Sequence, residues 1–280
     1  MKTALVLEGG AMRGLYTAGV LDVFMDNDIH FDAVIGVSAG ALFGVNLLSK
    51  QRGRVVRYNK KYNGSPNYMG VRPLLTTGNI INTELAYVKV PYEYDPFDDE
   101  TYKKSEVPFY AVVTNINTAE PEYIRISSIF DQMDTLRASG SMPFVSQPVN
   151  IDGNEYLDGA VTDSIPFEKM LEMGYDRLVV VLTKPKGYIK KPLPKALANI
   201  CYKKKYPKFY DAVVNRHIMY NGQINRLIEL ENEGKAIVIR PSKNIKISKI
   251  EKKPEKIQEM YDLGLLDAKN FIDSIKSQIL

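Results

Sequence analysis

The sequence predicts an α/β protein whose central sheet is mainly parallel, and three observations support this. Residues 3–7 and 32–37 are short apolar runs of the kind expected for buried strands. Each run is followed by a longer segment with helical periodicity, at 15–28 and at 38–50. Strand, helix, strand, helix within the first fifty residues is the pattern of parallel β-α-β units.

The middle of the chain is less regular. Residues 51–105 are rich in glycine and proline and predict short helices and loops. By the same criteria of periodicity and turn residues, the elements that follow are a strand at 107–115 with a hairpin partner at 121–126, a helix at 129–140, a hairpin over 149–157, a helix at 166–173 and a buried strand at 178–183.

Residues 184–208 form a lysine-rich excursion that contains nine lysines, four prolines and no acidic residue. A long helix at 210–233, a strand at 236–240 and a C-terminal helix over 254–279, broken near Gly264, complete the chain. We expect a single domain over 1–280. Its core would be about 3–183, followed by the excursion 184–208 and a helical C-terminal part at 209–280.

The composition argues against several classes of protein. The single cysteine, Cys201, excludes an intrachain disulfide framework, and two histidines are too few for a typical zinc hydrolase. The net charge of +4 is concentrated in residues 184–208, so we expect no nucleic-acid partner. The sequence has no apolar run of transmembrane length and no signal-peptide pattern at its start, which predicts a cytoplasmic location.

The sharpest motif is a G-x-S-x-G pattern formed by Gly36, Ser38 and Gly40, between a predicted strand and a predicted helix. In this context the serine is held at a tight, strained turn where a substrate can reach it. The positive end of the following helix points at a developing negative charge. The pattern therefore predicts a nucleophilic serine.

A second motif, the glycine-rich loop at residues 8–14, follows the first strand and contains Gly9, Gly10, Ala11, Arg13 and Gly14. Free backbone N–H groups at a helix start suit a phosphate or an oxyanion. The loop matches neither the dinucleotide fingerprint nor the P-loop.

A serine nucleophile needs a base. His30 precedes the second strand, so we expect it at the end of that strand opposite to Ser38. His217 lies in a predicted helix, where its spacing indicates a core-facing side chain, although the order Ser38, Asp158, His217 leaves a triad as an alternative. Asp158, followed by Gly159 after a predicted hairpin, is a base that would act directly, as a Ser–Asp dyad.

Together these motifs resemble those of the patatin-like phospholipases. The segments at 8–14, 36–40 and 158–160 have the order and approximate spacing of that family, and residues 138–143 are similar to its Ala-Ser-x-x-x-Pro stretch. Glu8 and Ala11 depart from the family pattern, which has Asp and Gly there. The resemblance implies a three-layer α/β/α patatin-like fold, Ser38 as nucleophile, Asp158 as base, and Gly9, Gly10 and Ala11 as oxyanion donors.

The expected function is that of a serine acyl hydrolase, a phospholipase, lysophospholipase or esterase that cleaves carboxylic esters of lipids. No metal or organic cofactor is expected. Two alternatives stay open: a non-enzymatic module that binds lipid or phosphate, and an acyltransferase that uses the same serine.

The excursion 184–208 mixes lysines with aliphatic and aromatic residues, which suits peripheral contact with an anionic membrane. It follows a strand whose carboxyl end would share an edge of the sheet with Ser38. A lid, a membrane-docking surface and a plain solvated loop are the alternatives for this segment.

Overall fold

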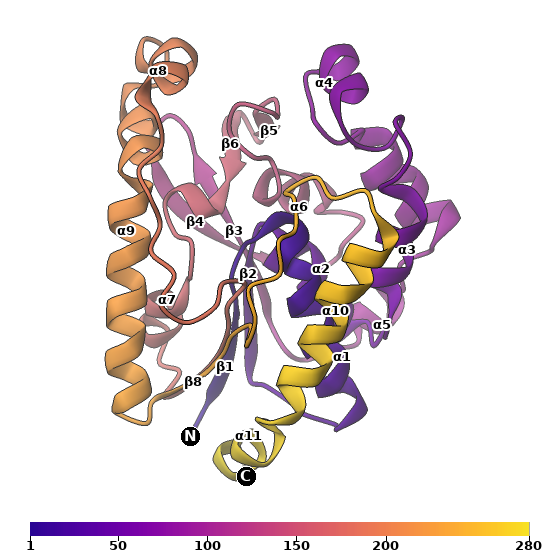
Figure 1. Ribbon diagram of the computed structural model, residues 1–280, viewed down its shortest axis with the longest axis vertical. Helices are drawn as coiled ribbons and strands as arrows, with labels where there is room; N and C mark the ends of the chain where they lie inside the picture. The colour runs from indigo at the N-terminus through magenta and orange to yellow at the C-terminus, as the bar shows by residue number, and fades with distance from the viewer. Residues whose placement is uncertain (280) are drawn as a thin grey trace.

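Figure 1 shows the computed structural model, which describes residues 1–279. Its strands are β1 (Thr3–Leu7), β2 (Ala33–Val37), β3 (Phe109–Asn115), β4 (Glu120–Ile126), β5 (Val149–Ile151), β6 (Asn154–Asp158), β7 (Arg177–Val181) and β8 (Ala236–Ile239). Its α-helices are α1 (Gly14–Asp26), α2 (Ala39–Leu48), α3 (Arg54–Tyr62), α4 (Val71–Thr77), α5 (Asp99–Lys103), α6 (Met133–Ser139), α7 (Phe167–Glu172), α8 (Lys195–Ala198), α9 (Pro207–Asn232), α10 (Pro254–Lys269) and α11 (Ile272–Ile279). Two short 3-10 helices, η1 (Ala11–Arg13) and η3 (Gly159–Val161), and two π-helices, η2 (Leu85–Tyr94) and η4 (Asn199–Lys203), complete the helical elements of the described residues.

All of the strands belong to one sheet with the order β5-β6-β3-β2-β1-β7-β8, and β4 pairs with β3 in addition. The run from β3 through β2, β1 and β7 to β8 is parallel. The pairs that involve β4, β5 and β6 are antiparallel. The predicted mixed α/β fold with a mainly parallel sheet is confirmed.

Alternate residues of β1 face opposite layers, as the two-residue period of a strand requires. Leu5 and Leu7 join a core formed with helices on one face, whereas Ala4 and Val6 join a separate core with α7 and α9. Figure 1 shows the same arrangement, with α7 and α9 on one side of the sheet and α1, α2 and α10 on the other. Because both faces of the parallel strands are covered, their sequences are almost continuously apolar.

Two strands share one edge of β3. β4 pairs with β3 from Phe109 to Asn115 and so occupies the whole of the other edge. On the shared edge, β2 runs parallel to β3 and ends with Val37 opposite Val112. β6 runs antiparallel and ends with Asp158 opposite Val113. The carboxyl ends of β2 and β6 therefore meet head-on, and this arrangement places the residues that follow each strand.

Two expectations need correction. The helix predicted at 129–140 begins only at Met133, because the Gln132 side chain accepts hydrogen bonds from the backbone N–H groups of residues 127 and 128 and holds a turn there. The C-terminal helix passes through Gly264 without a break and ends at Lys269. The excursion 184–208 contains two short helical segments, α8 and η4.

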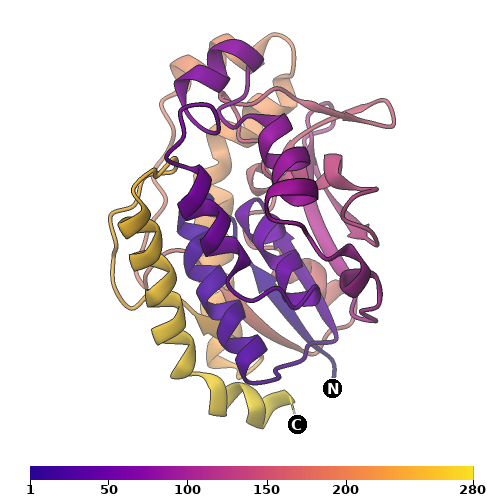
Figure 2. The ribbon, with the colours of Figure 1, turned by 90° about the vertical axis from the view of Figure 1, so that its right-hand side faces the viewer.

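Gly264 serves a different purpose from the predicted break. A Cβ atom on Gly264 would overlap the carbonyl oxygen of Tyr16, and one on Gly19 would overlap the carbonyl oxygen of Tyr261. The two glycines thus let α1 and α10 cross in direct backbone contact. Figure 2 shows α10, in yellow, beside α1. Within residues 1–279, no helix combines the length and hydropathy that a bilayer span requires.

We expect Gly264→Ala to destabilise the protein, because the added methyl group must push α10 away from α1. Overpacking of this kind costs about 1–3 kcal/mol. Urea unfolding would show a lower transition midpoint. The matched control is Gly222→Ala on α9, where a Cβ atom meets nothing within 4 Å, so a better helix former should leave the midpoint unchanged or raise it. An unchanged midpoint for Gly264→Ala would contradict the close crossing.

Candidate active site

Ser38 lies at the turn between β2 and α2 with φ 57° and ψ −124°. A non-glycine residue with positive φ is strained, and such residues persist only where the surroundings hold them. Here the backbone N–H of Ser38 donates to Ser139 Oγ at 2.9 Å, and Ser139 Oγ donates to the Val112 carbonyl at 2.7 Å. This relay fixes the turn to β3.

Asp158 ends β6 and lies directly against Ser38, as expected from the meeting of β2 and β6. Ser38 Oγ donates to Asp158 Oδ2 at 2.7 Å. The other carboxylate oxygen accepts from the backbone N–H of Ala160 at 2.9 Å, and the Asp158 carbonyl accepts from Thr114 Oγ1 at 2.9 Å. Both Ser38 and Asp158 are buried, with 6% and 5% of their surface exposed.

Burial raises the pKa of the Asp158 carboxyl above its ordinary value, because a charged carboxylate is poorly solvated there. The positive charge of Arg216, the Ser38 hydroxyl and the Ala160 N–H act in the opposite direction by stabilising the ionised form. A carboxylate with a raised pKa and a hydroxyl in contact with it is a suitable proton acceptor.

The glycine-rich loop packs beside this pair. A Cβ atom on Gly9 would lie 2.8 Å from the Cβ of Ser38, so the loop backbone is at the serine itself. Gly9, Gly10 and Ala11 all line a cavity that also contains Ser38. Ala11 has φ 48°, so it takes the left-handed conformation that a glycine would adopt more readily.

The remaining glycines of the motifs permit close packing around the elbow. A Cβ atom on Gly36 would overlap the Gly40 backbone, and one on Gly40 would overlap the backbone of β1. Gly14 packs against Ala39, and Gly159 packs against the Val112 backbone. All three motifs therefore meet at one place, at the carboxyl ends of β1, β2 and β6.

Within residues 1–279, neither histidine is hydrogen-bonded to Ser38 or Asp158. His30 is exposed in the loop before β2, as expected. The core-facing prediction for His217 is wrong, because its side chain is half-buried and lines the same cavity as Ser38. Its Nδ1 lies 3.1 Å from the Val214 carbonyl oxygen of its own helix.

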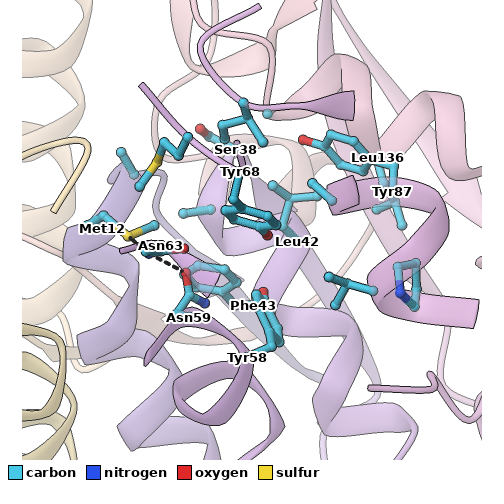
Figure 3. Close-up of a pocket in the computed structure, with 18 of the residues that line it drawn as sticks. Met12, Ser38, Leu42, Phe43, Tyr58, Asn59, Asn63, Tyr68, Tyr87 and Leu136 are labelled. Carbon is cyan, nitrogen blue, oxygen red and sulfur yellow. Dashed lines mark hydrogen bonds between the residues drawn. The ribbon is translucent and has the colours of Figure 1, made fainter. Parts of the chain in front are cut away.

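Ser38 stands between two cavities of opposite character. The first, of about 120 Å³, runs between α2, α3 and η2 and is lined mainly by apolar and aromatic side chains. Figure 3 shows Ser38 at the upper end of this group, with Leu42, Tyr68 and Tyr87 nearby and with Phe43 and Tyr58 at the lower end. We call it the apolar cavity.

The second cavity, of about 730 Å³, opens on the other side of Ser38. Besides the exposed Lys191, five cationic side chains from four separate segments line it: Arg13 from η1, Lys184 and Lys190 from the excursion, Arg216 from α9, and Lys249 from the loop before α10. We call these five residues the cationic cluster and the space they line the cationic cavity. Lys249 also lines the apolar cavity, so the two cavities meet at Ser38.

Sequence reasoning missed Arg216 and Lys249, because each is one of many basic residues in the C-terminal part. A signal was available for Arg216, which lies four residues before Tyr220 on the helix face that also carries His217. Nothing in the local sequence of Lys249 distinguishes it. Ser139 belongs to the stretch at 138–143 that was noted for its resemblance, but its role in holding Ser38 depends on the folded chain.

Similar proteins include two curated relatives. The uncharacterized protein YjjU of Escherichia coli is 31% identical over 189 residues, which are 66% of this chain and 52% of YjjU. The lysophospholipase nte1 of Aspergillus fumigatus is 27% identical over 179 residues, which are 63% of this chain and 12% of that protein. The chain therefore spans about half the length of the first relative and a small part of the second.

The solved structure of VipD from Legionella pneumophila is 14% identical, with a TM-score of 0.48 over 98% of this chain and 67% of that chain. Two family models also match. Residues 206–279 match a domain of unknown function (DUF6363), and residues 5–171 match the patatin-like phospholipases. Since the second match spans more than half of the sequence, the chain belongs to the patatin-like phospholipase family, a family of lipid hydrolases.

Proposed function

We propose that this protein is a carboxylic ester hydrolase that acts on lipids, with Ser38 as the nucleophile and Asp158 as its base. The observation that carries the proposal is the 2.7 Å hydrogen bond from Ser38 Oγ to Asp158 Oδ2, made at a strained elbow between two cavities. A strained, buried serine in contact with a carboxylate of raised pKa is costly to maintain, and such costs concentrate at functional sites.

In the acylation step, Ser38 Oγ attacks the ester carbonyl carbon while its proton moves to Asp158 Oδ2. The backbone N–H groups of the loop at Gly9, Gly10 and Ala11 stabilise the negative charge on the carbonyl oxygen. Collapse of the tetrahedral intermediate breaks the ester bond, and Asp158 returns the proton to the departing alcohol. The acyl group remains on Ser38.

In the deacylation step, Asp158 takes a proton from a water molecule that attacks the acyl-serine carbonyl. The fatty acid leaves, and the proton returns to Ser38 Oγ. Asp158 thus acts first as a base and then as an acid in each half of the cycle. The Ala160 N–H keeps the carboxylate aimed at Ser38 throughout.

The apolar cavity is suited to the acyl chain. The side chains that line this cavity close to Ser38 include Leu42, Tyr68 and Tyr87 (Figure 3). Burying each methylene group of a chain in such a space contributes about 0.8 kcal/mol. The substrate would therefore be an ester with an aliphatic acyl group.

Two rivals give different results in simple assays. A non-enzymatic lipid- or phosphate-binding module would not be labelled by a fluorophosphonate probe, whereas the hydrolase requires covalent labelling at Ser38. An acyltransferase would transfer the acyl group to an added alcohol in preference to water. Product analysis with and without alcohol acceptors separates it from a hydrolase.

Ser38→Ala and Asp158→Asn should each lower kcat on a p-nitrophenyl ester by at least about 100-fold, since a nucleophile and its base are removed. Fluorophosphonate labelling should vanish in Ser38→Ala. His217→Gln is the comparison variant and should keep most of the activity, because no hydrogen bond within residues 1–279 joins His217 to Ser38 or Asp158. A kcat close to the wild-type value in Asp158→Asn would contradict the Ser–Asp dyad. A large loss of kcat in His217→Gln would instead support the Ser38, Asp158, His217 triad.

Asp158→Asn should also raise the stability of the folded protein near neutral pH. The pKa of Asp158 is raised on folding, so the native state holds its proton more tightly than the unfolded state does. The tighter proton binding by Asp158 contributes fully to folding stability below the ordinary pKa of 3.8. This contribution is lost as the pH rises through the raised pKa of the folded state.

The neutral asparagine carries no such penalty, so the gap in urea midpoint between Asp158→Asn and wild type should widen from acidic to neutral pH. The variant combines higher stability with lost activity, which a simple unfolding effect would not produce. A lower urea midpoint for Asp158→Asn than for the wild type at neutral pH would contradict this prediction.

We further propose that the excursion 184–208 brings the protein to an anionic membrane. Its apolar side chains Ile189, Leu197 and Ile200 are exposed by 71%, 52% and 82%, among exposed lysines. In both ribbon views α8 lies at the same end of the molecule as α4, whose Leu75 is 81% exposed. The parallel strands run toward this end of the molecule, and Ser38 follows the carboxyl end of one of them. A membrane bound here would therefore lie beside the site, as proposed for a cytoplasmic protein that acts at the membrane surface.

Replacing Lys203, Lys204 and Lys205 with Gln should weaken binding to vesicles that contain phosphatidylglycerol, because each lysine near such a surface contributes about 1 kcal/mol. The charge-matched control changes Lys2, Lys269 and Lys276, which are exposed near the opposite end, and should bind as the wild type does. Vesicle sedimentation at low and high salt measures both. Equal binding to neutral and anionic vesicles would remove the membrane role.

A further inference from the structure

The cationic cavity holds a concentration of positive charge that the proposed chemistry does not use. Arg13, Lys184, Lys190 and Arg216 are half-buried around one space, and Lys249 stands exposed at its rim. Ester hydrolysis by Ser38 and Asp158 needs an acyl pocket and an oxyanion site, but it has no need for a ring of cations. The cluster therefore requires its own explanation.

No carboxylate of the described residues forms a direct ion pair with the cluster, although Glu8 and Asp158 attract some of its cations at longer range. Among residues 1–279, none of the five side chains lies within ion-pair distance of an aspartate or a glutamate. Arg216 donates only to a neutral group, Ser164 Oγ, at 3.2 Å, and the Arg13 Nε is buried without an acceptor. Charges arranged in this way repel one another and gain most when an anion enters between them.

The acids that line the same cavity are already engaged. Glu8 Oε2 accepts from the Thr183 N–H and hydroxyl, and Glu8 Oε1 accepts from the Tyr220 hydroxyl at 2.9 Å. Asp158 is held by Ser38 and Ala160. Both oxygens of each carboxylate therefore already accept hydrogen bonds from the protein, and each acid also has cations of the cluster nearby, which disfavours the ammonium group of a ligand there.

Two aromatic faces in the cavity are also covered by lysines. Lys184 Nζ lies 4.3 Å from the centre of the Tyr188 ring, and Lys190 Nζ lies 4.7 Å from the centre of the Tyr220 ring. A quaternary ammonium head group needs such open faces. At these two rings the cavity therefore presents cations where a choline group would require open aromatic faces, and Phe144 is the remaining aromatic residue of the lining.

The lysines of the cluster are positioned and partly desolvated. Hydrogen bonds between the Lys190 backbone and the Asn221 amide, of 2.9 and 3.1 Å, fix the excursion to α9. Burial, together with the neighbouring positive charges, lowers the pKa of Lys184 to about 8 and that of Lys190 to about 7. A bound dianion would offset both effects and favour the charged lysines.

We propose that the cationic cluster binds an uncapped phosphate monoester on the lipid substrate, so that the preferred substrate is an acyl glycerophosphate and not a choline- or ethanolamine-capped phospholipid. This inference rests on the proposed function for the acyl side of the site. A phosphate monoester carries about −1.5 to −2 charge at neutral pH and three acceptor oxygens. With the acyl chain in the apolar cavity and its ester at Ser38, the glycerol phosphate extends into the cationic cavity.

The proposal also gives the C-terminal part a role. Arg216, Tyr220 and Lys249 lie within residues 206–279, which match the domain of unknown function. They complete a cavity whose other walls come from the motif-bearing part of the chain. The C-terminal segment would thus determine which head group is accepted, while the motifs supply the ester chemistry.

The test compares three lysolipids that share one acyl chain: acyl glycerol 3-phosphate, lysophosphatidylcholine and monoacylglycerol. We expect kcat/KM for the phosphate monoester to exceed that for the other two by at least about tenfold, the value of one good charge-assisted contact. Lys184→Gln and Lys190→Gln should each reduce this preference about tenfold. Lys186→Gln, an exposed lysine of the same loop outside the cavity, is the matched control and should preserve it.

A binding measurement separates head-group recognition from catalysis. The ether-linked alkyl glycerol 3-phosphate has no ester to cleave, and calorimetry should show that it binds the wild type about tenfold more tightly than Lys190→Gln. Binding without acyl release from any lipid would reject the hydrolase and keep the phosphate site. Acyl release with equal kcat/KM on the three lipids would overturn the head-group assignment, and competition by inorganic phosphate would then identify a free phosphate as the ligand of the cluster.

Discussion

The head-on meeting of β2 and β6 along one edge of β3 is the constraint on which the site depends. Val37 and Asp158 lie opposite consecutive residues of β3, Val112 and Val113. A serine one residue beyond β2 must therefore contact the last side chain of β6, although 120 residues separate them in sequence. The geometry leaves no place for a third residue between the hydroxyl and the carboxylate. A directly bonded pair is thus a property of the sheet as well as of the two side chains.

This arrangement carries costs that the surrounding layers offset. Ser38 has positive φ, Ala11 takes a conformation better suited to glycine, and Asp158 is ionised only against the penalty of burial. The parallel strands beneath are covered on both faces by helices, and α10 crosses α1 with backbone in contact with backbone. Such a rigid base holds the strained turn in place, because alternatives would require the packed layers to separate.

Sequence reasoning identified what local patterns encode. The strands, the serine elbow and the loop at 8–14 follow from periodicity, turn residues and motif spacing. Asp158 follows from the chemistry of the serine, which needs a base, and from the unsuitable positions of both histidines in the sequence. Features that depend on contacts between distant segments were not accessible: Gly264 looks like a helix break until Tyr16 is seen beneath it, and His217 looks like a core residue until the cavity beside α9 is known. The expectation of a single domain stays a prediction.

The two cavities draw to different extents on the part of the chain after β7. The serine–aspartate pair and most of the lining of the apolar cavity come from residues before β7, whereas Arg216 and Lys249 of the cationic cluster are held by segments that come after it. Exchanging or remodelling these later segments would alter what the outer cavity admits without disturbing the elbow. If the proposed roles of the two cavities hold, the segments after β7 are the ones to vary in a directed-evolution experiment that aims to change ligand choice and keep the serine–aspartate pair intact.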